Sequence, residues 1–198
     1  MSSTHPRTGV LALQGAFGLH RAVLTRLGEP STEVRTIEDL LAVDRLIIPG
    51  GESSVMAKLA DESGMMPVLR GRIEAGMPVL GTCAGAIMLA AEIVDGRVGQ
   101  PSIGVLDITV RRNAFGRQAE SFTTNLVMID DADPAAEAHD FEAVFIRAPG
   151  IERTGSAVAT MASHDGQPVM VRQENVIATT FHPELSGDDT VHRLFLNL

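Results

Sequence analysis

The only cysteine of this 198-residue chain lies in a pattern that can make it a nucleophile. Cys83 is the centre of Gly-Thr-Cys-Ala-Gly at 81–85, after an apolar run and before an almost wholly apolar stretch. Gly-x-Cys-x-Gly between a strand and a helix is the cysteine form of a nucleophile elbow, a tight turn with small flanking residues. The thiol would lie at a helix N-terminus, which favours negative charge, and the Ala84 N–H could hold an oxyanion. Alone, the pattern fits a small buried hydrophobe equally well, because that is the usual role of a lone cysteine.

A cysteine nucleophile needs a base, usually histidine, and a group that orients the base. Of the six histidines, only His182 directly follows an apolar run, at 176–181, which places it at the carboxyl end of a predicted strand. Active sites of open α/β sheets collect at that edge. Glu184 follows beyond Pro183, and residues two apart share a face in the extended backbone that precedes a proline. We therefore expect Glu184 to orient the His182 imidazole; the alternative is a turn that only ends the strand.

Two adjacent glycines follow another predicted strand. Pro-Gly-Gly-Glu-Ser-Ser at 49–54 comes directly after the apolar run at 46–48. Paired glycines let the backbone approach a ligand closely, and their N–H groups could complete an oxyanion hole with Ala84. A phosphate-binding loop would need Gly-Lys-Ser/Thr, whereas Glu52 would repel phosphate. A plain turn remains the other interpretation.

The elements that must position these residues alternate between strand and helix in the first half of the chain. Strands are predicted at 10–13, 33–35, 46–48 and 78–80. Helices are predicted at 19–27, 37–43, from a cap at Ser53 or Ser54, at 67–74 and at 84–93. This alternation predicts a mainly parallel sheet with helices on both faces.

The second half of the chain is richer in strands. They are predicted at 105–110, 122–128, 143–146, 157–161, 169–172 and 176–180, with one helix at 190–196. With so few intervening helices, we expect antiparallel additions to the sheet edge. The predicted fold class is therefore a three-layer, flavodoxin-like α/β fold. We expect one domain over 1–198, with 1–8 as a flexible N-terminal tail.

Composition narrows the function classes. Hydrophobic residues make up 44% and charged residues 21%, which is typical of a globular domain. No apolar run is long enough to span a membrane, and the polar start lacks a secretory signal, so we expect a cytoplasmic protein. A net charge of −9 argues against nucleic acid as a partner. A single cysteine excludes an intramolecular disulfide and any multi-cysteine zinc site.

Taken together, the motifs at 49–53, 81–85 and 181–184 resemble those of the class I, or triad-type, glutamine amidotransferases. Two further segments narrow the resemblance: Arg-Asn-Ala-Phe-Gly-Arg-Gln at 112–118 and Phe-Ile-Arg-Ala-Pro at 145–149. With Leu-Ala-Leu-Gln-Gly at 11–15, they are similar to the glutaminase subunits of pyridoxal 5′-phosphate synthases. The resemblance extends from about Val10 to the C-terminus.

The resemblance implies roles for individual residues. Cys83 would be the nucleophile, His182 the base and acid, and Glu184 the orienting carboxylate. The residues implied to bind glutamine are Gly51, Glu52, Ser53, Arg112, Ile146 and Arg147. Gly51 and Ala84 would supply the oxyanion hole.

The same resemblance implies a reaction and a partner. The chain would hydrolyse L-glutamine to L-glutamate and ammonia through a cysteine thioester, without a metal or organic cofactor. The ammonia would pass to a (β/α)8-barrel synthase subunit within a large hetero-oligomer.

Two positions depart from the family pattern. Leu19 precedes His20 where an acidic residue is usual, and Ser54-Val55 stands where threonines are usual. Neither affects the proposed triad, although the first could alter how the partner docks. Three alternatives stay open: a glutaminase subunit of another amidotransferase, a cysteine hydrolase or thiol-redox protein, and a catalytically silent scaffolding subunit.

Overall fold

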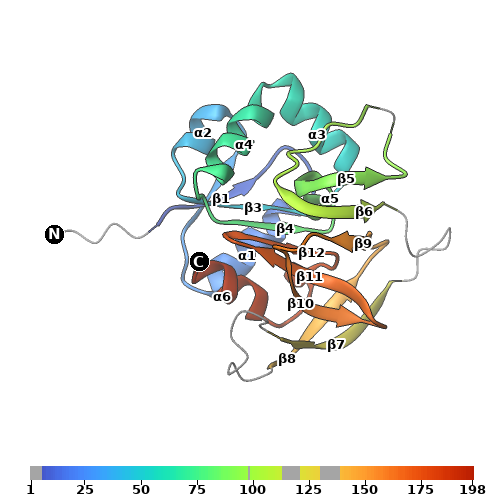
Figure 1. The fold of residues 1–198 in the computed structure, drawn as a ribbon. Coiled ribbons are helices and arrows are strands. Elements are labelled where there is room, and N and C mark those ends of the chain that lie inside the picture. Colours follow the sequence, from blue (N-terminus) through green and yellow to red (C-terminus); the bar gives the residue numbers. More distant parts are fainter. Residues whose placement is uncertain (1–5, 98, 113–120, 130–138) are drawn as a thin grey trace.

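The centre of the structure is a seven-stranded sheet with helices on both faces (Figure 1). The computed structural model describes residues 6–97, 99–112, 121–129 and 139–198. In spatial order the strands are β10 (Ala159–His164), β11 (Gln167–Gln173), β12 (Val176–Thr179), β4 (Val79–Thr82), β3 (Arg45–Ile48), β1 (Thr8–Leu11) and β2 (Ser31–Val34). The strands from β12 to β2 are parallel, whereas β10 and β11 extend one edge antiparallel. The predicted fold class is confirmed.

Two hydrophobic cores lie on opposite faces of this sheet. One contains side chains from α2 (Ile37–Leu41), α3 (Ser53–Glu62), α4 (Met65–Glu74) and α5 (Ala84–Leu89). The other contains side chains from α1 (Phe17–Arg26) and α6 (Thr190–Leu196). Leu46 and Ile48 of β3 belong to the first core and Ile47 to the second. Because successive side chains of a strand point to opposite faces, a strand covered on both sides is apolar throughout.

Two smaller sheets flank the central one. β5 (Ala90–Val94), β6 (Leu106–Arg111) and β9 (Gly150–Thr154) form a three-stranded sheet, and β7 (Phe122–Met128) pairs with β8 (His139–Phe145). The expectation of additions to the central edge is correct for β10 and β11. It is wrong for β6, β7 and β8, which pair within the small sheets instead.

Two local predictions need correction, and one strand was missed. The helix predicted at 84–93 ends at Leu89, because Ala90 turns to an extended backbone (φ −60°, ψ 141°) and β5 pairs with β6. Strand β9 was not predicted. Thr8 begins β1 and is buried, so it does not belong to a flexible tail. None of the helices in the described part of the chain has the length and apolarity needed to cross a membrane.

Candidate active site

Four adjacent parallel strands bring the candidate residues to one edge of the sheet. β12, β4, β3 and β1 are neighbours, and the segments that carry His182, Cys83, Gly50 and Gln14 follow their carboxyl ends. Ile48 lies beside Gly81, and Thr82 beside Thr179, so β3, β4 and β12 end nearly level. Motifs far apart in the sequence therefore meet here, at the edge where α/β sheets bind ligands.

Cys83 lies in a strained turn between β4 and α5. Its backbone has φ 49° and ψ −101°, a region that residues with a side chain rarely adopt. Its N–H donates to the Thr179 carbonyl at 2.8 Å, which joins the turn to β12. A Cβ on Gly85 would lie 2.1 Å from the Ile48 carbonyl oxygen, so this flank must be glycine. The turn thus has the tight geometry expected of a nucleophile elbow.

His182 and Glu184 are in direct contact. His182 Nδ1 is 2.7 Å from Glu184 Oε1, and the Glu184 side chain is fully buried. The extended spacing predicted for the pair is wrong, because Pro183–Leu185 form a single 3-10 turn (η1). The His182 N–H donates to the Val144 carbonyl at 2.8 Å, which ties the backbone of His182 to β8. The turn still directs the carboxylate to the imidazole.

The surroundings change the proton affinity of both groups. Burial alone would lower the pKa of His182, but hydrogen bonds with Cys83 and Glu184 raise it to about 10. Burial would raise the pKa of Glu184, yet the neighbouring His20 and the hydrogen bond from His182 lower it. A carboxylate therefore faces Nδ1, and the other ring nitrogen is left to exchange a proton with Cys83.

The paired glycines pass very close to this group. A Cβ on Gly50 would lie 2.4 Å from Cε1 of His182, so only glycine fits. The Gly50 carbonyl accepts a hydrogen bond from the Ala16 N–H at 2.9 Å. Because N–H and C=O point in opposite directions across a trans peptide, the Gly51 N–H faces away from Ala16. Ala84 is the first residue of α5, so its N–H has no acceptor within that helix.

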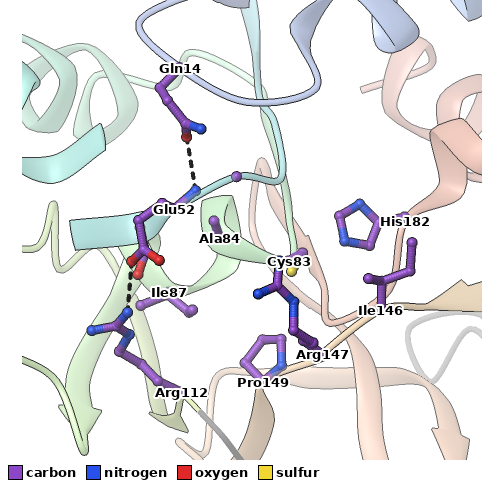
Figure 2. Close-up of a pocket in the computed structure, with 12 residues that line it drawn as sticks. Gln14, Glu52, Cys83, Ala84, Ile87, Arg112, Ile146, Arg147, Pro149 and His182 are labelled. Carbon is purple, nitrogen blue, oxygen red and sulfur yellow. Dashed lines mark hydrogen bonds and ion pairs between the residues drawn. The ribbon is translucent and has the colours of Figure 1, made fainter. Parts of the chain in front are cut away.

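A pocket of about 320 Å³ opens beside Cys83 (Figure 2). Every residue predicted for the site lines it except Glu184, which lies behind His182: the lining set is Gly51, Glu52, Ser53, Cys83, Ala84, Arg112, Ile146, Arg147 and His182. Cys83 and His182 lie at one end, and Glu52 and Arg112 at the other. Residues 113–118, part of the motif that narrowed the resemblance, lie outside the described residues.

The sequence matches the SNO glutamine amidotransferase family over residues 10–198. The chain belongs to this family. It is 53% identical to the pyridoxal 5′-phosphate synthase subunit PdxT of Herpetosiphon aurantiacus, over 96% of this chain and 98% of the relative. The PdxT subunit of Streptomyces coelicolor is 50% identical over 100% of this chain and 95% of its own.

Solved structures agree with this family. A crystal structure of a glutamine amidotransferase matches with a TM-score of 0.87 and 48% identity, over 96% of this chain and 97% of its own. A crystal structure assigned to a GMP synthase subunit of Thermoplasma acidophilum has a TM-score of 0.66 at 20% identity, over 98% and 94% of the chains. At that identity, the second match shows the shared fold alone.

The far end of the pocket carries opposite charges. Arg112 Nη2 lies 2.8 Å from Glu52 Oε1, which also accepts a hydrogen bond from the Ser54 hydroxyl at 2.9 Å. Burial would raise the pKa of Glu52, but Ser54 and the charges of Arg112 and Arg97 lower it. Glu52, rather than Ser53 or Ser54, caps α3, because its carboxylate accepts from the Ser54 N–H.

Several residues of this candidate site were not predicted. Gln14, Ile87 and Pro149 also line the pocket. Two signals could have found the first two of them. Gln14 lies just beyond a predicted strand, and Ile87 lies four residues after Cys83 along a helix. Gln100 binds Arg112 Nη1 at 3.1 Å and the Ser53 hydroxyl at 3.3 Å, and no pattern in the sequence indicates it.

Proposed function

We propose that this chain hydrolyses L-glutamine to L-glutamate and ammonia and supplies the ammonia to a pyridoxal 5′-phosphate synthase. The observation that carries the proposal is the convergence of Cys83, His182 and buried Glu184 beside a charged pocket. The family match and the names of relatives about 50% identical support the same activity and pathway. We place the activity in the cytoplasm, a prediction from the sequence alone.

The charges of the pocket suit a zwitterionic amino acid. Glutamine carries an α-carboxylate and an α-ammonium group at one end and an uncharged carboxamide at the other. Arg112 and Arg147 can bind the carboxylate, and Glu52 the ammonium group. The carboxamide then extends toward Cys83, with Ile146 and Ile87 against the methylene groups. In this arrangement the substrate competes with the Glu52–Arg112 ion pair of the free protein.

The first half-reaction is acylation of Cys83. Its sulfur attacks the carboxamide carbon, and the charge that develops on the carboxamide oxygen is held by the N–H groups of Gly51 and Ala84. Protonated His182 donates its proton to the departing nitrogen, which leaves as ammonia. Glu184 holds the ring through Nδ1 and stabilises its positive charge. A glutamyl thioester on Cys83 remains.

The second half-reaction is hydrolysis of that thioester. Neutral His182 takes a proton from water, and the resulting hydroxide attacks the thioester carbonyl. The same two N–H groups hold the second oxyanion. Collapse of this intermediate releases glutamate and regenerates Cys83. These steps need only the side chains and backbone of this chain.

The partner that we propose is a (β/α)8-barrel synthase subunit within a large hetero-oligomer. The curated relatives are named as subunits of pyridoxal 5′-phosphate synthase, which supports a partner subunit. The barrel architecture rests on the family resemblance of the sequence. A glutaminase that serves another pathway is the alternative, and the similarity to a GMP synthase subunit supports only a common fold.

The test is glutamate release by the chain alone, with the synthase subunit, and with Cys83→Ala in both settings. We expect release that rises on addition of the synthase and disappears in Cys83→Ala. Activity that survives in Cys83→Ala would refute the mechanism. Activity that is indifferent to the synthase would refute the partner while leaving hydrolysis intact.

A second comparison tests ammonia supply. With Cys83→Ala bound to the synthase, we expect no product from glutamine but normal product from added ammonium salt, because only the nitrogen source is lost. Product formation that fails with ammonium as well would show that the variant damages the complex. No glutamate release from the wild-type complex would favour the silent scaffolding subunit.

A further inference from the structure

Two buried histidines lie directly behind Glu184. His20 of α1 and His192 of α6, here called the histidine pair, each have an exposed fraction of 0%. His20 Nε2 is 3.3 Å from Glu184 Oε2, and His20 Nδ1 is 3.0 Å from His192 Nε2. The line of contacts therefore continues from Cys83 and His182 through Glu184 into the protein interior.

The hydrogens of the histidine pair can be assigned from the ends of this line. Glu184 Oε2 has no well-aligned hydrogen bond among the described residues, although His20 Nε2 is its polar neighbour. A proton on Nε2 faces both this oxygen and Thr82 Oγ1, which is 3.2 Å away. A lone pair on Nε2 would instead face a carboxylate that is fully buried with it, which is repulsive. His20 must therefore carry hydrogen on Nε2 and accept at Nδ1.

The other end of the line requires the same assignment. If Nδ1 of His20 accepts, His192 Nε2 must be the donor, and neutral His192 then has no hydrogen on Nδ1. His192 Nδ1 has no partner among the described residues, so the assignment leaves an unpaired acceptor there. The opposite tautomers would leave a buried unpaired N–H, which native structures avoid more strictly.

Burial keeps both rings of the histidine pair neutral, against the negative charge of Glu184. Burial lowers the pKa of His20, and burial together with His20 lowers the pKa of His192 to about 3. The other ionisable groups nearby are His182 and the exposed pair Arg26–Asp189. β8 also packs against η1, but its charged residues Asp140 and Glu142 are exposed. Within the described part of the chain, Glu184 is thus the only anion buried in this cluster.

We propose that His20, oriented by His192, is a positioning residue that keeps the Glu184 carboxylate ionised and directed at His182. This inference rests on the proposed glutaminase function, since it concerns the orientation of the base in that reaction. If His182 alone held the Glu184 carboxylate, through one oxygen, the carboxylate could still rotate about the side-chain torsions of Glu184. The Nε2–H of His20, 3.3 Å from the second oxygen, restricts that freedom and favours the ionised form.

The test compares two substitutions at His20 in the complex with the synthase. His20→Leu removes the donor, whereas His20→Gln keeps an N–H close to the position of Nε2. Losing the N–H that lies 3.3 Å from the Glu184 carboxylate should have about a tenfold effect, the low end for a polar contact with a charged group. We expect kcat to fall by that factor in His20→Leu, with KM changed by less than about threefold, and to recover largely in His20→Gln.

The pH profile separates positioning from simple packing. Without the His20 donor the pKa of Glu184 rises, so the acid limb of kcat/KM should move to higher pH by about one unit. His192→Leu should produce a smaller shift in the same direction, because His20 loses the group that fixes its tautomer. An unmoved acid limb, or His20→Gln no more active than His20→Leu, would overturn the proposal.

A readout without glutamine keeps this inference distinct from the proposed function. The rate at which iodoacetamide alkylates Cys83 follows its thiolate and depends on the charge of His182, whatever the substrate. We expect the pH dependence of alkylation to shift between the wild-type chain and His20→Leu, with thermal denaturation confirming that both are folded. Equal alkylation profiles would refute the inference even in a chain that hydrolyses glutamine.

Discussion

Gly50→Ala is the substitution whose effect the geometry defines most sharply. A Cβ at this position would lie 2.4 Å from Cε1 and 2.9 Å from Nδ1 of His182, but at an ordinary 3.4 Å from Cys83 Cβ. To restore normal contact, the imidazole must retreat by about 1 Å. The ring is held by Glu184 on Nδ1, so retreat disturbs that hydrogen bond.

The expected loss follows from the size of this displacement. Misplacing a catalytic group by about 1 Å can reduce the rate about a hundredfold. We therefore expect kcat for glutamate release to fall by about that factor, with a smaller change in KM because the residues that we propose to bind glutamine are not touched. Overpacking should lower the free energy of unfolding by about 1–3 kcal/mol, which leaves the protein folded in an assay at 25 °C.

The control is the same substitution where the structure has room. Gly18 lies in α1, and a Cβ there would meet nothing within 4 Å. Gly18→Ala should keep full activity and gain about 0.5–1 kcal/mol of stability, because alanine loses less backbone entropy in a helix. If Gly50→Ala retained kcat within threefold of Gly18→Ala, the close approach of the glycine loop to His182 would not be a constraint on catalysis.

Three other substitutions have defined outcomes. Cys83→Ala should lower the pKa of His182 from about 10, because one of the two hydrogen bonds that raise this pKa is lost. NMR titration of the imidazole measures the change, and an unchanged pKa would show that the cause is wrong. Arg112→Gln should raise KM for glutamine about tenfold to hundredfold with little change in kcat. Arg111→Gln is its matched control, because Arg111 pairs with Asp95 and Glu152 away from the pocket, and equal effects of the two would contradict the assignment. Arg45→Met should lower the free energy of unfolding, measured by urea titration, by about 3 kcal/mol. The reason is that buried Arg45 binds Glu29, Thr8 and the Leu196 carbonyl. The kcat per folded molecule should stay constant.

The central sheet was predictable because it is buried on both faces. Runs such as Leu-Ile-Ile at 46–48 are apolar throughout, and the residues that follow them are the candidate site residues. Strand β9 was missed because Gly-Ile-Glu-Arg-Thr has a single buried apolar residue, Ile151. The helix predicted at 84–93 was too long because the apolar residues of α5 continue into β5 without a break that marks the end of the helix. The helix ends where β5 pairs with β6.

The site shows the same division between local and non-local information. Cys83, His182 and Glu184 follow from local patterns at strand ends. The sequence did not predict the 3-10 turn that joins His182 to Glu184. An extended backbone would bring the two side chains into the same contact, so the pattern did not distinguish the two conformations. Gln100 binds the pocket residues Arg112 and Ser53 only because the loop between β5 and β6 packs beside them, and nothing local indicates it. The histidine pair depends on α1 and α6 meeting across the sheet from α5.

The strained backbone of Cys83 has an evolutionary consequence. At φ 49° and ψ −101°, a residue with a side chain is held at an energetic disadvantage of about 1–3 kcal/mol that glycine would largely escape. Selection for folding alone would therefore drive this codon toward glycine, and only selection for activity maintains the thiol. A lineage that stopped using the reaction would be expected to lose the cysteine early and to become more stable as it did so.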